Sequence, residues 1–173
     1  MTPDADDDAL ERIASHVERS GDGRRGGMAN VTNRRRRVRS GQLSLDEALI
    51  ALFIGAMNAN DHVAPDEAER AHHLIWSTRR FRRKSGDTVG KLIQDMRTVV
   101  EESNARTVIG RATKAIPARL RLSAFAVVAD LLLADGKLEA PERRFLRGLG
   151  SELKLDHDSA RQIIDVVVLK NQL

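Results

Sequence analysis

The sequence predicts an all-α protein of about seven helices, and two observations carry this prediction. From Leu43 onward, apolar residues recur at intervals of three and four, which is the period of one helix face. Prolines and capping residues stand where these stretches begin. Residues 166–169 have a strand-like composition, but the phase of the residues before them suits a helix. The 173 residues correspond to about one domain.

Each helix has a start signal or an apolar face of its own. Ser44 and Glu47 form a capping box. Pro65, Pro117 and Pro141 suit a first helical turn, because the backbone N–H that proline lacks has no partner there. The third, fourth and last helices have apolar residues at regular spacing on one face. The helices are expected at about 44–59, 65–84, from 87 onward, 106–115, 117–134, from 141 onward, and after a cap at Asp156 or Asp158.

Two of these helices are expected to be central, because they are apolar nearly all round. Residues 48–57 are apolar on every side, and residues 124–134 include one polar side chain, Asp130. A carboxylate buried without a partner costs on the order of several kcal/mol. We therefore expect Asp130 to lie at the helix margin or to pair with an arginine, with a metal ion as the alternative. The candidate partners are Arg119, Arg121 and Arg143.

Residues 1–42 are predicted to form a disordered tail rich in Arg, Gly and Asp, in front of a helical domain at residues 43–173. Residues 21–27 are too polar and too rich in glycine to pack, and the arginines at 34–37 repel one another. Residues 8–19 have enough apolar spacing for one short, frayed helix. The tail is therefore not expected to contribute to the core.

Composition excludes several classes of function. The chain has no cysteine, which excludes disulfides, thiolate zinc sites and cysteine catalysis. Four Phe, one Trp and no Tyr make a base-stacking surface for single-stranded nucleic acid a poor prediction. The first residues are acidic rather than apolar, and no stretch reaches the roughly 18 apolar residues of a membrane span. We expect a cytoplasmic protein, with a peripheral position at the inner face of the membrane as an alternative.

Two stretches of the chain match at an offset of 75 residues. Residues 51–67 and 126–142 each comprise a buried helix, a short polar turn, one apolar residue and a helix led by proline with an early Glu. In this register Asn60 corresponds to Asp135, and Glu67 corresponds to Glu142. The match predicts two pseudo-symmetric helix-turn-helix repeats around the two central helices.

The second repeat carries a family resemblance. Residues 134–146, Ala-Asp-Gly-Lys-Leu-Glu-Ala-Pro-Glu-Arg-Arg-Phe-Leu, resemble the signature of the TerB-like domain, a family that includes tellurite-resistance TerB proteins and the N-terminal domain of a DnaJ-like membrane co-chaperone. The resemblance covers residues 43–173, although Asn60-Asp61-His62 departs from the pattern in the first repeat. It implies a non-enzymatic, all-helical module of the response to tellurite and other chemical stress, with membrane-associated partners and metal binding by its acidic turns.

The acidic residues of the two turns are the metal candidates. Carboxylate oxygens suit a hard divalent cation such as calcium. Alternatively, these residues have structural roles: Asp135 and Gly136 form a turn, and Glu139 and Glu142 lie at the start of a helix. An EF-hand is excluded by Val63, which stands where the loop needs glycine. His72 and His73 are adjacent and so do not form a zinc pair on one helix face. The candidate ligands are Asp135, Glu142, Asp130, Asp61 and Glu67.

Residues 79–84, which we name the basic run, are the second candidate site. Positive charge complements the dipole at the end of a helix, so a solvated helix end explains the run without a ligand. Alternatively, with Arg34 to Arg37, the run contacts nucleic acid phosphates, anionic lipid or an acidic partner. The candidate contacts are Arg79, Arg80, Arg82, Arg83 and Lys84.

No enzymatic motif is found, so we expect a binding protein. The sequence has no nucleophile elbow, no P-loop and no Gly-rich dinucleotide turn. The leading hypothesis is a TerB-like stress-response module that acts as an interaction scaffold, with protein partners that include membrane-associated stress proteins. The alternative is an adaptor that binds nucleic acid or a membrane surface through the basic run, with nucleic acid not favoured. A co-chaperone role ranks lower because the chain lacks the J-domain His-Pro-Asp motif.

Overall fold

The computed structural model describes residues 42–59, 65–134 and 137–172, with the backbone alone for residues 65–70. This part of the chain contains seven α-helices, one 3-10 turn and no strand, so the all-α prediction is confirmed. The tail predicted at residues 1–42 lies almost entirely outside the described residues. The elements are α3 (Leu45–Met57), α4 (Pro65–Ser77), α5 (Gly86–Glu102), α6 (Ala105–Ala115), η1 (Ala118–Leu120), α7 (Arg121–Leu132), α8 (Ala140–Glu152) and α9 (His157–Lys170).

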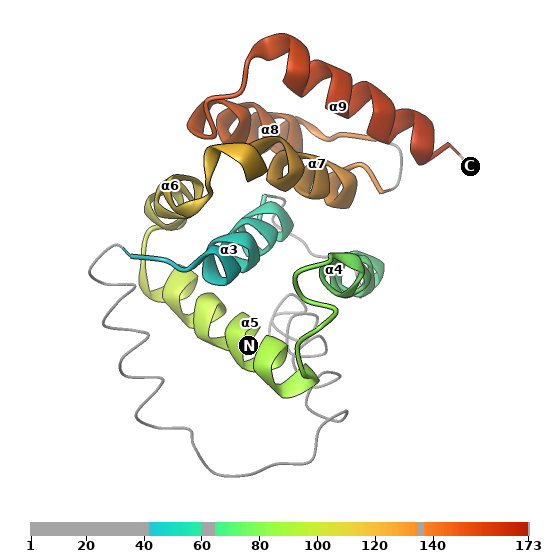
Figure 1. Cartoon of the computed structure of the whole chain (residues 1–173). Helices are drawn as coiled ribbons and strands as arrows, with labels where there is room; N and C mark the ends of the chain where they lie inside the picture. Colours follow the sequence, from blue (N-terminus) through green and yellow to red (C-terminus); the bar gives the residue numbers. More distant parts are fainter. Residues whose placement is uncertain (1–41, 60–64, 135–136, 173) are drawn as a thin grey trace, which may run out of the picture.

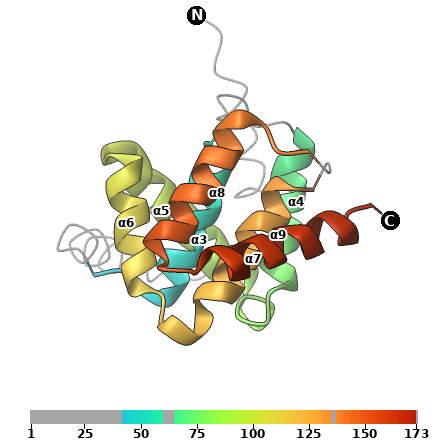
Figure 2. The same ribbon diagram turned by 90° about the horizontal axis from the view of Figure 1, so that it is seen from above.

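Helix α3 occupies the centre of the bundle. It packs against α5 on one side and α7 on the other, with α6 and α4 at its flanks (Figure 1). Helix α7 in turn packs against α8 and α9, and the view from above shows these last three helices together over α3 (Figure 2). The two helices that the sequence predicts to be central are therefore the two that pack against the most other elements.

The capping box predicted at the start of α3 is confirmed. The backbone N–H of Ser44 donates to Glu47 Oε2 at 2.6 Å, and the N–H of Glu47 donates to Ser44 Oγ at 3.3 Å. Every side chain from Ile50 to Met57 is buried, as the lack of a polar face predicts. Burial on all sides fixes α3 as the helix around which the others are arranged.

The second predicted helix is too long. It is expected to continue to about Lys84, but α4 ends at Ser77. The hydroxyls of Ser77 and Thr78 donate to the carbonyls of Leu74 and Ile75 at 3.0 and 2.7 Å, so side chains satisfy carbonyls at the end of the helix. Phe81 is completely buried in the core. Its burial holds residues 78–84 as a turn over the bundle rather than as helix.

The remaining helix starts follow their capping residues. Ser85, Asn104 and Asp156 each accept a backbone N–H near the start of α5, α6 and α9. Asp156, rather than Asp158, is therefore the cap of the last helix. The predicted start of the fifth helix at Pro117 is too early. The chain after Pro117 forms the 3-10 turn η1, and α7 starts at Arg121.

The helix bounds agree with the internal repeat. Residues 65–77 of α4 and 140–152 of α8 differ by the same offset of 75 residues that aligns the two stretches of sequence. α7 likewise begins and ends within one residue of the position that α3 predicts. Pseudo-symmetric packing of the two repeats stays a prediction.

Candidate functional site

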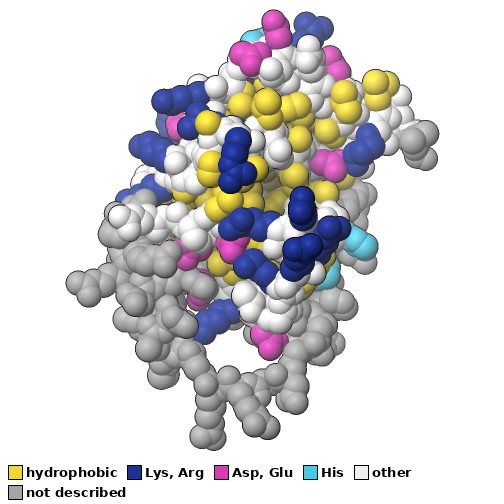
Figure 3. Space-filling view, in the orientation of Figure 1, with side chains coloured by type: hydrophobic (Ala, Val, Ile, Leu, Met, Phe, Trp, Pro, Cys, Tyr) yellow, Lys and Arg dark blue, Asp and Glu magenta, His cyan; other side chains and the backbone are white. Residues whose placement is uncertain are grey.

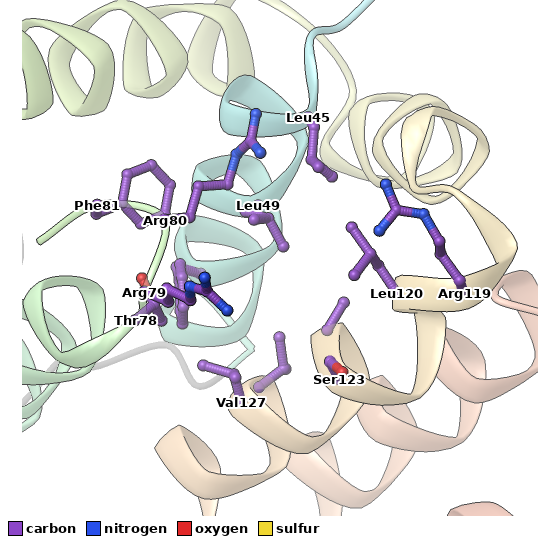
Figure 4. A pocket seen from close by; sticks show the side chains of 13 residues that line it. Leu45, Leu49, Thr78, Arg79, Arg80, Phe81, Arg119, Leu120, Ser123 and Val127 are labelled. Carbon is purple, nitrogen blue, oxygen red and sulfur yellow. The ribbon is translucent and has the colours of Figure 1, made fainter. Parts of the chain in front are cut away.

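A groove with an apolar floor lies between α3 and α7, and we name it the α3–α7 groove. Its volume is about 550 Å³. In the space-filling view, hydrophobic side chains are visible between Lys and Arg side chains on this face (Figure 3). The close view shows how the lining residues lie (Figure 4). They are Leu45, Leu49, Phe53, Thr78, Arg79, Arg80, Phe81, Arg119, Leu120, Ser123, Ala124, Val127 and Val128.

Helical periodicity builds the floor from both sides. Leu45, Leu49 and Phe53 are spaced by four residues, so they form one ridge along the N-terminal half of α3. Across the groove, Ala124 and Val128 show the same spacing on α7, with Val127 beside them. Apolar side chains of both helices thus line a hollow that none of the described helices fills.

Arginines border this floor from two different elements. Arg79 extends from the turn after α4 and Arg119 from η1, and their guanidinium groups point toward the groove from opposite sides (Figure 4). Both residues are exposed, and among the residues that the structure describes neither has a hydrogen-bond or ion-pair partner. The groove therefore combines apolar surface with two positive charges that no acidic side chain of the described chain balances.

A third arginine of the groove is neutralised. Arg80 Nε pairs with Asp46 Oδ1, and Lys84 Nζ lies 3.0 Å from Asp46 Oδ2. Asp46 is in the first turn of α3, so these contacts tie the turn at 78–84 to the start of that helix. They hold the neighbouring Arg79 at the edge of the groove.

The basic run is therefore divided by the fold. Arg79 and Arg80 line the groove, whereas Arg82 and Arg83 are exposed and do not line it. Lys84 is half-buried beside Asp46. Phe81, in the middle of the run, explains the division, because its burial directs its neighbours to different sides of the turn.

The structure assigns protein partners to the two metal candidates whose side chains it describes. Glu142 is buried at the start of α8, and its Oε2 accepts the backbone N–H of Glu139 at 2.7 Å. Asp130 lies at the margin of α7, where its Oδ1 is 2.7 Å from Lys170 Nζ. The salt bridge predicted for Asp130 is thus present, but the partner is a lysine of α9 and not one of the three arginines proposed from the sequence.

The structure does not place the side chains of the other three metal candidates. Asp61 and Asp135 lie outside the described residues, and the Glu67 side chain is not described. Within the parts of the chain that are described, no group of three or more His, Asp or Glu side chains is placed to hold a metal ion. Metal binding by the acidic turns stays a prediction.

A second groove, the α6–α8 groove, lies at the other end of α3. Its volume is about 470 Å³, and it is bordered by the C-terminal end of α3, the start of α6 and the outer half of α8. Its lining includes Arg106 and Arg144 together with Glu152, so both signs of charge are present. Gly55 lies at its floor, where Ile109 of α6 approaches the backbone of α3 closely.

The sequence indicates one side of the α3–α7 groove, the basic run, but not the other side, which η1 and α7 form. It suggests Arg119 only as a partner for Asp130. Leu49 and Phe53 fall within the predicted buried stretch at residues 48–57, and Leu45 lies one turn before Leu49. Nothing in one sequence shows that α7 lies far enough from this ridge to leave a hollow.

The part of the chain that the structure describes is a bundle of helices with two surface grooves. The family model described as tellurite resistance protein TerB matches residues 46–165. The chain therefore belongs to the TerB family, as the resemblance of residues 134–146 indicates. No curated protein and no solved structure matches it. In the portion that the structure describes, no helix is long and apolar enough to cross a membrane.

Proposed function

We propose that this chain is a non-enzymatic module of a tellurite and chemical-stress response that works as an interaction scaffold through the α3–α7 groove. The family match supports the stress response, and the groove supports the scaffold. The carrying observation is the apolar floor between Arg79 and Arg119, two arginines without partners in the described chain. Binding surfaces typically combine a concave apolar centre with a few placed polar groups, and arginine is enriched at protein interfaces.

Energetics favour a partner on this surface. Apolar area removed from water contributes roughly 25 cal/mol per Å², and Leu45, Leu49 and Val127 are all partly exposed in the groove. A guanidinium that gains a carboxylate partner inside a groove forms a stronger hydrogen bond than it does with water at an open surface. A partner that covers the groove gains from both effects at once.

A complementation assay in the source organism tests this function. We expect a deletion strain to grow poorly on tellurite and the full chain to restore growth. Ser123→Trp places a bulky ring into the α3–α7 groove from an exposed position, so this variant should not restore growth at equal protein level. The matched control Ser151→Trp changes an exposed serine of the α6–α8 groove and should restore it.

Two results would contradict the proposal. Normal growth of the deletion strain on tellurite and on other oxidising stress would remove the stress-response part. Full rescue by Ser123→Trp would show that the α3–α7 groove is not needed for the function.

Divalent-cation binding belongs to the same proposal and rests on the acidic turns. We expect calcium to shift the amide signals near residues 60–67 and 135–142 of the full chain, and Asp135→Ala to abolish the shifts. Asp158→Ala is the control, because it removes an exposed carboxylate away from the turns. No shift at millimolar calcium, magnesium or zinc would assign the acids to helix starts and turns alone.

The second candidate function is an adaptor for a polyanion, favoured by the exposed arginines Arg79, Arg82 and Arg83. Such binding weakens steeply with salt. It predicts that Arg83→Glu and Arg79→Glu reduce binding to anionic vesicles or duplex DNA by similar factors, because a diffuse charged surface does not distinguish residues inside and outside the groove. Binding that is independent of salt would contradict the adaptor function.

A further inference from the structure

We propose that the α3–α7 groove receives one amphipathic helix of a partner protein, whose apolar face is flanked on both edges by carboxylates. This inference rests on the proposed role of the groove as a binding surface and specifies its ligand. Three features support it: the shape of the apolar floor, the positions of the unpaired arginines, and the poorer fit of other anionic ligands.

The floor has the shape that a helix requires. Helices pack by inserting the ridge of one into the groove formed by its neighbours, with side chains four residues apart forming the ridges. Leu45, Leu49 and Phe53 provide such a ridge on α3, and Ala124 and Val128 provide another on α7. The hollow between them is open to solvent along one side (Figure 3). A third helix that lies along it presents apolar residues at i, i+3, i+4 and i+7 to both ridges.

The arginines define the charge of that helix. Arg79 and Arg119 reach toward the groove from opposite sides (Figure 4), and neither has a partner among the described residues. Planar guanidinium groups bind carboxylates through two parallel hydrogen bonds. Because Arg80 is already paired with Asp46, the groove calls for one carboxylate on each edge of the ligand rather than for a densely charged surface.

Other anionic ligands fit this groove less well. A membrane surface is flat, so its headgroups reach the rim while the apolar floor stays uncovered. Duplex nucleic acid presents phosphates on its outside while its base faces are stacked on one another, so it has no apolar face to cover Leu45 and Leu49. A single acyl chain covers the floor, but it leaves its outer side exposed to water because the groove is open. A helix with an apolar face and acidic edges satisfies floor and rim together.

The test uses the full chain and two labelled synthetic peptides of about 18 residues, roughly five helical turns. Both peptides carry leucines on one face. In one, glutamates flank the leucines on both edges, and in the other lysines take their places. We expect the glutamate peptide to bind, measured by fluorescence anisotropy, and the lysine peptide to bind at least about tenfold more weakly.

Substitutions in the protein locate the binding. Arg79→Glu and Arg119→Glu should each weaken the glutamate peptide by about tenfold or more and strengthen the lysine peptide. Arg83→Glu is the matched control: it makes the same charge change on the same turn outside the groove and should alter affinity by less than about twofold. All three arginines are exposed, so folding of each variant is expected and is checked by thermal melting.

Several outcomes would overturn the inference. Equal affinity for the two peptides would show that the rim does not select carboxylates. Equal losses for Arg79→Glu and Arg83→Glu would indicate a diffuse electrostatic contact. Absence of peptide binding, with anionic vesicles bound instead, would assign the rim to a lipid surface. If Ser123→Trp still abolishes growth on tellurite while neither peptide binds, the groove is functional with another ligand, and this inference alone fails.

Discussion

The two grooves beside α3 differ in lining and in charge. The α3–α7 groove borders the N-terminal part of α3, and its lining includes the partly exposed Leu45 and Leu49. The α6–α8 groove borders the C-terminal end of α3, and its lining includes small residues such as Ala59, Ala105 and Gly148. The two grooves are therefore similar in volume but differ in the size of the side chains that line them.

The α3–α7 groove is better suited to a charged ligand than the α6–α8 groove. In the α6–α8 groove, Arg106 and Arg144 stand beside Glu152, so the lining supplies charges of both signs. In the α3–α7 groove, the described lining supplies arginines and no acidic residue. A complementary partner that covers exposed apolar surface and pairs with an unbalanced charge lowers the free energy of the complex. Substitutions at Phe81 and Gly55 test this comparison, and substitutions at Asp130 and Asp156 test an ion pair and a helix cap elsewhere in the bundle.

The largest effect is expected at Phe81, because it anchors the turn that carries one edge of the α3–α7 groove. Phe81→Ala removes a fully buried ring and should lower the free energy of unfolding by about 3–5 kcal/mol. Urea denaturation measures the loss. The exposed neighbour substitution Arg83→Ala should stay within about 0.5 kcal/mol of the wild type. A loss below about 1 kcal/mol for Phe81→Ala would show that the turn is not anchored by the core.

Gly55 gives the next largest effect and tests the close approach of α3 and α6 at the floor of the α6–α8 groove. A Cβ atom there would overlap Ile109 Cδ1 and lie 3.4 Å from Phe145 Cε2. Gly55→Val should therefore lower the free energy of unfolding by about 1–3 kcal/mol through overpacking. Gly148→Val is the matched control, since nothing lies within 4 Å of a Cβ at that position, and it should be neutral or slightly stabilising. Equal effects would mean that α3 and α6 do not require a glycine for their close approach.

Asp130 and Lys170 should contribute less, because both side chains of the pair retain solvent contact. A double-mutant cycle with Asp130→Ala and Lys170→Ala is expected to give a coupling of about 0–1 kcal/mol. If Asp130 instead held a metal ion, calcium would stabilise the wild type against denaturant and would not stabilise Asp130→Ala. An unchanged midpoint in both proteins supports the ion pair.

Asp156 is expected to give the smallest effect, and one that depends on pH. The backbone N–H of Ser159 donates to its carboxylate at 2.8 Å and holds the pKa of Asp156 below its usual range. A lowered pKa in the folded state adds stability above the ordinary pKa of aspartate, and this is lost as pH falls through the folded value. The difference in melting temperature between wild type and Asp156→Ala should therefore be largest near neutral pH and shrink in acid. Asp158→Ala leaves this hydrogen bond in place and should show a weaker trend.

Much of the fold could be predicted because local signals determine it. The capping box of Ser44 and Glu47, the prolines and the apolar spacing predict each of the seven helices in the described part of the chain. The predicted end of α4 is wrong, because the burial of Phe81 stabilises the turn more than helical structure would stabilise the basic run. Intrinsic preference is a weak guide where one large side chain can reach the core.

The candidate site was less predictable, because it depends on the distance between helices. The arginines of the basic run were recognisable as a charged segment, but their division between groove and solvent follows from the buried Phe81. Arg119 contributes only through the placement of η1 opposite that turn. The pair of Asp130 with Lys170 joins residues 40 positions apart, which no local pattern indicates.

Amide NMR on the full 19.2 kDa chain, with the glutamate-flanked peptide as the ligand, shows directly whether the peptide binds in the α3–α7 groove. The groove account predicts shifts for residues 45–53, 78–81 and 119–128, which border the α3–α7 groove. Residues 105–109 and 144–152 of the α6–α8 groove should keep their positions. Shifts concentrated in the second set, or spread over all exposed arginines alike, would contradict the account.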